Sequence, residues 1–234
     1  MMTKHIFPEW LTKYGILVYI MALAVVTAVY SSYSLPWYYM LSGVVAVLVF
    51  FGYGQTLTQR LSETRVRSQK NFERHIFWIA LIPRVIWMFL IYTIFMQTYG
   101  DPFGFDNADA TYYDPLGQLV ASLIKDGNFH FYDEITAWSG SDDISDMGYG
   151  IYVGLIYFLT GSGNVLSEAS LFGAEVGTNS ISIVILRLIK CVLSALSVML
   201  IYRLAKRNFE DKTARVAAVF CALWPNFCTI AVFI

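Results

Sequence analysis

Apolar residues in this chain gather into long runs that are separated by shorter polar segments. A helix needs about 20 mostly apolar residues to cross a bilayer. Five runs approach that length, at residues 14–32, 37–54, 75–97, 181–202 and 215–234. The pattern therefore predicts an all-α, polytopic membrane bundle of about five transmembrane helices.

A sixth apolar run, at residues 147–161, is shorter than the others. Its apolar core of about a dozen residues suits an interfacial or re-entrant helix better than a spanning one. If residues 147–161 crossed the membrane, the basic segment 203–215 would lie on the same side of the membrane as the acidic residues that precede residue 147. We therefore expect this helix to lie flat on the membrane.

Basic residues are segregated along the chain. Residues 98–180 contain twelve acidic residues and one base, Lys125, whereas the segments 60–74 and 203–215 are rich in lysine and arginine. Because lysine and arginine favour the cytoplasmic side of a membrane, both basic segments and the N-terminus should be cytoplasmic. Residues 99–180 should then form one large external loop of a multi-pass protein.

Composition excludes some partners and some kinds of covalent crosslink. The chain is 57% hydrophobic with a formal net charge of -1, and its three cysteines all lie in apolar runs. Neither a nucleic-acid partner nor a disulfide framework is expected. The first run lacks a small-residue cleavage site and should be an uncleaved span. The last run stays apolar to residue 234, so we expect these residues to be the front of a longer protein.

The external loop has clear helix punctuation. Asp114 suits an N-cap, Pro115 a first helical position and Gly127 the position after a helix end. The apolar residues between them recur with helical spacing, so one face of this helix should lie along the membrane surface. They are Leu116, Leu119, Val120, Leu123 and Ile124.

Two groups of aspartates flank the predicted loop helices. Asp101, Asp106 and Asp109 precede the first helix, where partial desolvation near a membrane would raise their proton affinity and suit a general base. For each of these aspartates taken alone, the alternative is an ordinary solvated loop residue.

Asp142, Asp143 and Asp146 precede the run 147–161. They offer oxygen ligands to a divalent cation, although the signal is weak without a glycine-containing ligand loop; Asp146 could instead cap the helix.

Three basic residues lie inside predicted spans. Arg187 and Lys190 are three residues apart near the external end of the fourth span, where they could hold a phosphate. They could equally extend to the interface or pair with the acidic loop. Arg84 should face the bundle interior, because a charge facing lipid is unfavourable.

Three passages together resemble the GT-C superfamily of integral-membrane glycosyltransferases. The first passage follows the third span and reads FDNADATYYDPLGQLVASLIKDG. The second is similar to the family's second juxtamembrane helix and reads SDMGYGIYVGLIYFLTGSG. The third is similar to a pair of spans joined by a basic turn and reads ILRLIKCVLSALSVMLIYRLAKRNFEDKTARVAAVFCALWP. The blocks follow in family order and cover about residues 76–234. The first two spans, with their basic loop to residue 74, would be an addition to a module that begins at residue 75.

The resemblance implies transfer of a sugar from a polyprenyl-phosphate-linked donor to a glycan, lipid or protein acceptor at the external, periplasmic face of a bacterial inner membrane. It implies that Asp109, or else Asp106, acts as catalytic base and that Tyr113 belongs to the substrate site. Arg187, with Lys190, would stabilise the departing phosphate. No cofactor is specified, and a divalent cation is allowed but not required.

Two other classes stay open. A non-catalytic membrane scaffold could use the acidic external loop to dock a partner protein or a cation. A transporter is less favoured, because the spans contain few acids and no pair of helices broken by glycine or proline.

Overall fold

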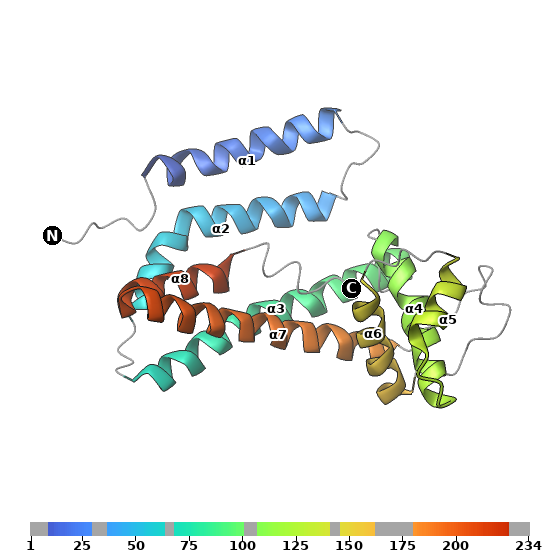
Figure 1. Ribbon diagram of the computed structural model, residues 1–234. Helices are drawn as coiled ribbons and strands as arrows, with labels where there is room; N and C mark the ends of the chain where they lie inside the picture. Colours follow the sequence, from blue (N-terminus) through green and yellow to red (C-terminus); the bar gives the residue numbers. More distant parts are fainter. Residues whose placement is uncertain are drawn as a thin grey trace. The chain divides into compact units, whose positions relative to one another are not determined.

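The computed structural model describes residues 9–29, 37–63, 68–100, 107–140, 146–161 and 180–224 (Figure 1). All regular secondary structure in these ranges is α-helical, which confirms the all-α part of the predicted fold class for the described part of the chain. The helices are α1 (Glu9–Val29), α2 (Trp37–Ser62), α3 (Gln69–Tyr99), α4 (Asn107–Lys125), α5 (Phe131–Ser139), α6 (Met147–Thr160), α7 (Ser180–Asn208) and α8 (Asp211–Leu223).

Two helices, α3 and α7, are long and apolar enough to cross a membrane. Only 28% and 33% of the residues in their apolar windows are buried, whereas a core helix of a soluble protein would be mostly buried. Among the described residues only these two helices meet both conditions, so two candidate spans are supported and not the five predicted. Their exposed faces include Trp78, Ile82, Ile86, Leu193, Leu200 and Leu204.

The chain divides into two compact units. Unit 1 comprises Met1–Arg84 and Leu193–Ile230, and unit 2 comprises Val85–Val192 and Ala231–Ile234. The division predicted at residue 74, which separates the first two spans from the rest, is a different grouping and stays a prediction.

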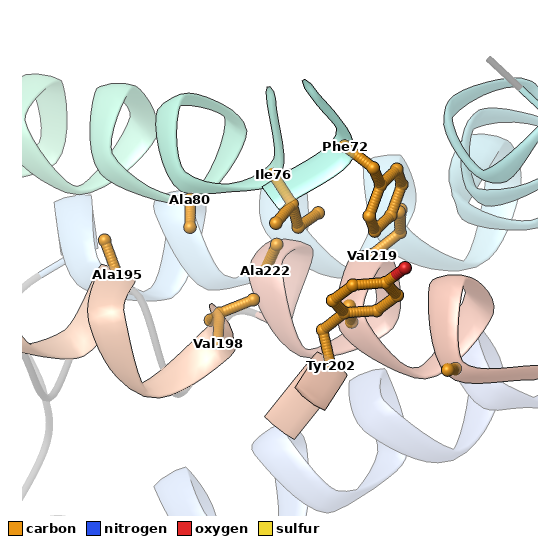
Figure 2. Packing of buried hydrophobic residues seen from close by; sticks show 10 residues of the cluster. Phe72, Ile76, Ala80, Ala195, Val198, Tyr202, Val219 and Ala222 are labelled. Atoms are coloured by element: carbon orange, nitrogen blue, oxygen red, sulfur yellow. The ribbon is translucent and has the colours of Figure 1, made fainter. Parts of the chain in front are cut away.

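The core of unit 1 forms where α3, α7 and α8 meet (Figure 2). Phe72 and Ile76 of α3 pack against Tyr202 of α7 and Val219 of α8, and all four are buried. Alanines on all three helices complete the cluster. Small side chains let helix backbones approach closely, which is how helices associate when lipid removes the hydrophobic drive between them. These alanines are Ala80, Ala195, Ala214, Ala218 and Ala222.

The start of α3 lies beside the end of α7. Arg203 donates to the Glu73 carboxylate at 2.7 Å, and the Lys206 ammonium donates to the Gln69 side-chain oxygen at 3.0 Å. The two helices are therefore antiparallel neighbours in unit 1, and the basic ends predicted to share a side are adjacent. Both helices extend beyond their predicted runs, by a turn or more into these polar ends.

Asp211 joins α7 to α8 at this end. Its carboxylate accepts hydrogen bonds from Tyr202 at 2.8 Å and Arg215 at 2.8 Å, and it forms an ion pair with Lys206 at 3.1 Å. Burial opposes its ionisation, but these three donors outweigh burial and hold the pKa of Asp211 below its usual range. An acidic residue in the first turn also suits the positive end of the helix dipole.

Arg84 is fully buried in unit 1, as predicted for a charge inside a span. Its guanidinium donates to the carbonyl oxygens of Ala80 at 2.6 Å and Ala222 at 3.1 Å, and to the Ser194 hydroxyl at 2.9 Å. These acceptors belong to α3, α8 and α7. Arg84 therefore links the three helices of the unit 1 core.

Unit 2 contains α4, α5 and α6 (Figure 1). α4 ends as predicted, because Gly127 has a φ of 73° and donates to Ile124, while Asn128 donates to the Leu123 carbonyl, as in a Schellman motif. Its start was predicted wrongly: α4 begins at Asn107, and Pro115 lies inside the helix.

The apolar face of α4 is confirmed but does not form a free platform. Leu116 and Val120 are fully buried and pack with Ile135 of α5 and with partly buried side chains of α6, including Met147 and Ile151. The face predicted to lie on the membrane is thus covered by neighbouring helices. The structure adds α5, which the apolar pattern did not predict.

Candidate functional site

Close packing of α4 against α6 positions the polar side chains of unit 2. Gly117 of α4 and Gly150 and Gly154 of α6 lie at the crossing, where the opposite helix fills the space that side chains would need. A Cβ atom at Gly154 would lie 3.0 Å from the Gly117 carbonyl oxygen. The two backbones are therefore in direct contact, which fixes the side chains on either side of the crossing.

Asp114 is bound by donors from both helices. The Tyr157 hydroxyl of α6 donates to one carboxylate oxygen at 2.6 Å, and the Gln118 amide donates to the other at 3.0 Å. Tyr157 is fully buried. Burial, followed by the neighbouring Asp114 carboxylate, raises the pKa of Tyr157, so its hydroxyl stays protonated and remains a donor. This network replaces the N-cap role predicted for Asp114.

A second chain of contacts connects α7 to the loop helices. The Lys190 ammonium donates to the Tyr149 hydroxyl at 3.3 Å and lies 5.4 Å from the centre of that ring. Tyr149 packs edge-on against Tyr113, with ring centres 4.8 Å apart. The Tyr113 hydroxyl in turn donates to Asp146 at 3.1 Å. Three residues predicted from sequence, Tyr113, Asp146 and Lys190, are thus joined through Tyr149.

Arg187 lies one helical turn before Lys190 and is only 1% exposed. It is close enough to Tyr157 and Lys190 to interact electrostatically with both. Its neighbour Leu186 packs in a buried cluster with Tyr157. The Arg187 side chain therefore does not extend to the membrane interface, which was one of the alternatives for this residue.

Two adjacent cations make an arrangement suited to an anion. A guanidinium and an ammonium repel each other when both are charged, and an oxyanion placed between them would relieve that repulsion. Phosphate is well matched, because arginine binds its oxygens in pairs and lysine binds as a point charge.

Several predicted site residues are not placed by the structure. Asp109 lies in the first turn of α4, but its side chain is outside the described residues, as are Asp106, Asp142 and Asp143 entirely. Whether Asp109 faces Arg187 therefore stays a prediction.

Asp146 does not cap α6 as predicted. It occupies the N-cap position with φ 60°, a left-handed conformation, and makes no side-chain cap hydrogen bond. Its carboxylate is exposed and accepts from Tyr113 instead. Within the described ranges no group of three histidine, cysteine, aspartate or glutamate side chains could hold a metal ion.

Sequence reasoning missed Gln118, Tyr149 and Tyr157, and it gave Asp114 only a capping role. The signal that could have found the tyrosines is their spacing in MGYGIYVGLIYFLTG, since Tyr149 and Tyr157 fall eight residues apart on one helical face. A tyrosine within an apolar helix needs a partner for its hydroxyl. Two glycines four residues apart on the same helix also indicate a close helix crossing.

Comparison with protein-family models, with curated proteins and with solved structures finds no match to this chain.

Proposed function

We propose that the chain is a multi-pass inner-membrane protein in which α1, α2 and the segment from Arg215 onward add spans to α3 and α7. Support comes from the exposed apolar faces of α3 and α7 and from the apolar runs elsewhere. The adjacent basic ends of α3 and α7 favour the cytoplasm, so the acidic segment between Tyr99 and Ser180 joins the opposite, external ends.

Unit 2 is the proposed donor site. Lys190 and Arg187 hold the phosphate of a polyprenyl-phosphate-linked sugar, and the Tyr149 hydroxyl orients the Lys190 ammonium. The observation that carries this proposal is the placement of Arg187, which is buried one turn from Lys190 and close to Tyr157, while Lys190 contacts Tyr149. Two like charges one turn apart in an apolar helix, one buried and one partly buried, are unfavourable unless a counter-ion or function compensates.

The proposed reaction is glycosyl transfer by direct displacement. The oxygen of an acceptor hydroxyl forms a bond to the anomeric carbon while the bond from that carbon to the phosphate oxygen breaks. Asp109, or Asp106 in its place, takes the hydroxyl proton, and the bonding electrons leave with the phosphate, where Arg187 and Lys190 stabilise the charge. The acceptor is a glycan, lipid or protein at the external face.

A non-catalytic scaffold is the second candidate, favoured by the acidic character of residues 98–180. Such a scaffold would use the loop carboxylates to dock a basic partner or a cation. It would need neither the Asp109 carboxylate as a base nor a phosphate at Arg187.

The two candidates are separated by a transfer assay on membranes that contain the full chain. Polyprenyl-phosphate sugars with a labelled sugar serve as donors, and Asp109→Asn is compared with Asp126→Asn, an exposed aspartate at the end of α4. We expect Asp109→Asn to abolish transfer at unchanged expression and Asp126→Asn to retain it. Transfer that survives Asp109→Asn would remove this residue's role, and no transfer with any donor would favour the scaffold.

A further inference from the structure

An open surface cavity of about 380 Å³ lies between the first turns of α3 and the second half of α7 in unit 1. Its lining divides into two chemical types. Polar and charged side chains come from the start of α3, and apolar side chains come from both helices. The residues are Lys70, Glu73, Arg74, Phe77, Leu196 and Met199.

The charged side of the cavity is positive. Glu73 is neutralised by Arg203, whose guanidinium lies 2.7 Å from its carboxylate, and Gln69 donates to its other oxygen at 2.8 Å. Lys70 and Arg74 are exposed, and among the described residues neither forms an ion pair with a carboxylate. Two positive charges therefore stay available to an anion.

The other side of the cavity is apolar. Phe77 and Met199 are partly buried at the edge of the unit 1 core, and Leu196 is 41% exposed. A free phosphate ion would use only the basic rim and leave this wall uncovered. A ligand with an anionic head and an attached hydrocarbon chain would use both sides.

We propose that this cavity binds an anionic phospholipid, with the headgroup phosphate at Lys70 and Arg74 and the start of an acyl chain along Phe77, Leu196 and Met199. Basic pockets between membrane helices are known to recognise such headgroups. The inference rests on the membrane insertion of α3 and α7 proposed above but not on glycosyl transfer.

Native mass spectrometry of the detergent-solubilised full chain tests the proposal, with phosphatidylglycerol and phosphatidylcholine as probes. Each basic residue near a headgroup contributes about fivefold in affinity, so Lys70→Gln with Arg74→Gln should reduce phosphatidylglycerol binding by roughly tenfold or more. The matched control is Arg60→Gln with Arg207→Gln, which removes two exposed charges elsewhere in unit 1. An equal loss in both double variants would mean general charge attraction and would overturn the proposal.

A second variant leaves the charges intact. Leu196→Trp fills the cavity from its apolar side and should also weaken phosphatidylglycerol binding, while added inorganic phosphate should not compete. Effective competition by inorganic phosphate, or unchanged binding in Leu196→Trp, would contradict a lipid site. Extraction of membranes with alkaline carbonate tests membrane insertion separately from lipid binding. Release of the chain would overturn the proposed membrane insertion. Retention of the chain without selective lipid binding would overturn only the lipid site.

Discussion

Two buried arginines, Arg84 in unit 1 and Arg187 in unit 2, occupy contrasting surroundings. Arg84 donates to two backbone carbonyls and a serine hydroxyl, which belong to three different helices. Arg187 lies near Tyr157 and beside a second cation, Lys190. Both are at most 1% exposed and both lie in helices apolar enough to span a membrane.

The difference separates a structural arginine from a candidate binding arginine. Neutral carbonyl acceptors satisfy a guanidinium without attracting a ligand, and they hold helices together. A guanidinium beside an ammonium raises the local positive potential, which is unfavourable in the empty site and favourable once an anion binds. Burial alone would have assigned the two residues the same role.

The largest effect is expected from replacing each arginine with methionine. Arg84→Met removes three hydrogen bonds from the unit 1 core and should lower the free energy of unfolding by about 3 kcal/mol. Arg187→Met also removes a repulsion between two like charges, so it should lower that free energy by less than about 1 kcal/mol. Tryptophan fluorescence during denaturation in detergent measures both.

The comparison would fail if Arg187→Met were as destabilising as Arg84→Met. Arg187 would then be a second structural link, and its surroundings would carry no argument for a ligand. Arg84→Lys serves as a control for charge, because it retains a positive charge but loses the planar set of N–H donors of the guanidinium.

A smaller effect is expected at the crossing of α4 and α6. Gly154→Ala places a Cβ against the side chain of Val120 and 3.0 Å from the Gly117 carbonyl oxygen, so the helices must separate, at about 1–3 kcal/mol. Gly148→Ala is the matched control in the same helix, since nothing lies within 4 Å of its Cβ. Helix propensity should make that change neutral or slightly stabilising.

Hydrogen exchange of the α4 and α6 amides measures this effect locally. Faster exchange in Gly154→Ala and unchanged exchange in Gly148→Ala are the expected results. Equal behaviour of the two variants would show that the crossing tolerates a methyl group and does not fix the site.

The smallest effect concerns pH and Asp211 in unit 1. Because its pKa is lowered in the folded state, its contribution to stability is present above about pH 4, the usual aspartate range, and is lost as pH falls through the folded pKa. The side chain is 42% exposed, so the contribution should be below about 1 kcal/mol. The difference in unfolding midpoint between the native chain and Asp211→Asn should shrink between pH 6 and pH 3; a constant difference would contradict it.

Sequence reasoning located the elements whose signals are local and long. α3, α6 and α7 follow from their apolar runs, and Gly127 ends α4 because the turn there requires positive φ. The nine-residue helix α5 was missed, since it begins with Asp133 and Glu134 in its first turn and is packed through Ile135 against α4. A helix this short depends on tertiary packing, which a local pattern does not contain.

The candidate site was only half predictable for a related reason. Arg187 and Lys190 are conspicuous in the sequence because charges are rare in apolar runs. Their tyrosine neighbours resemble ordinary interfacial aromatics until the crossing of α4 and α6 places them. Asp114 was given a capping role by its position before proline, and the tertiary hydrogen bond from Tyr157 overrides that local signal.

The most direct measurement of the central claim is the affinity of the full chain for undecaprenyl phosphate in phosphatidylcholine nanodiscs. Arg187→Gln with Lys190→Gln is compared with Arg60→Gln with Arg207→Gln, so that each variant loses two cations and the control residues belong to no proposed site. Loss of tenfold or more in the first variant and near-native affinity in the second is the predicted result. Equal affinity of the two variants would show that unit 2 holds no phosphate site, and the proposed donor site would be withdrawn.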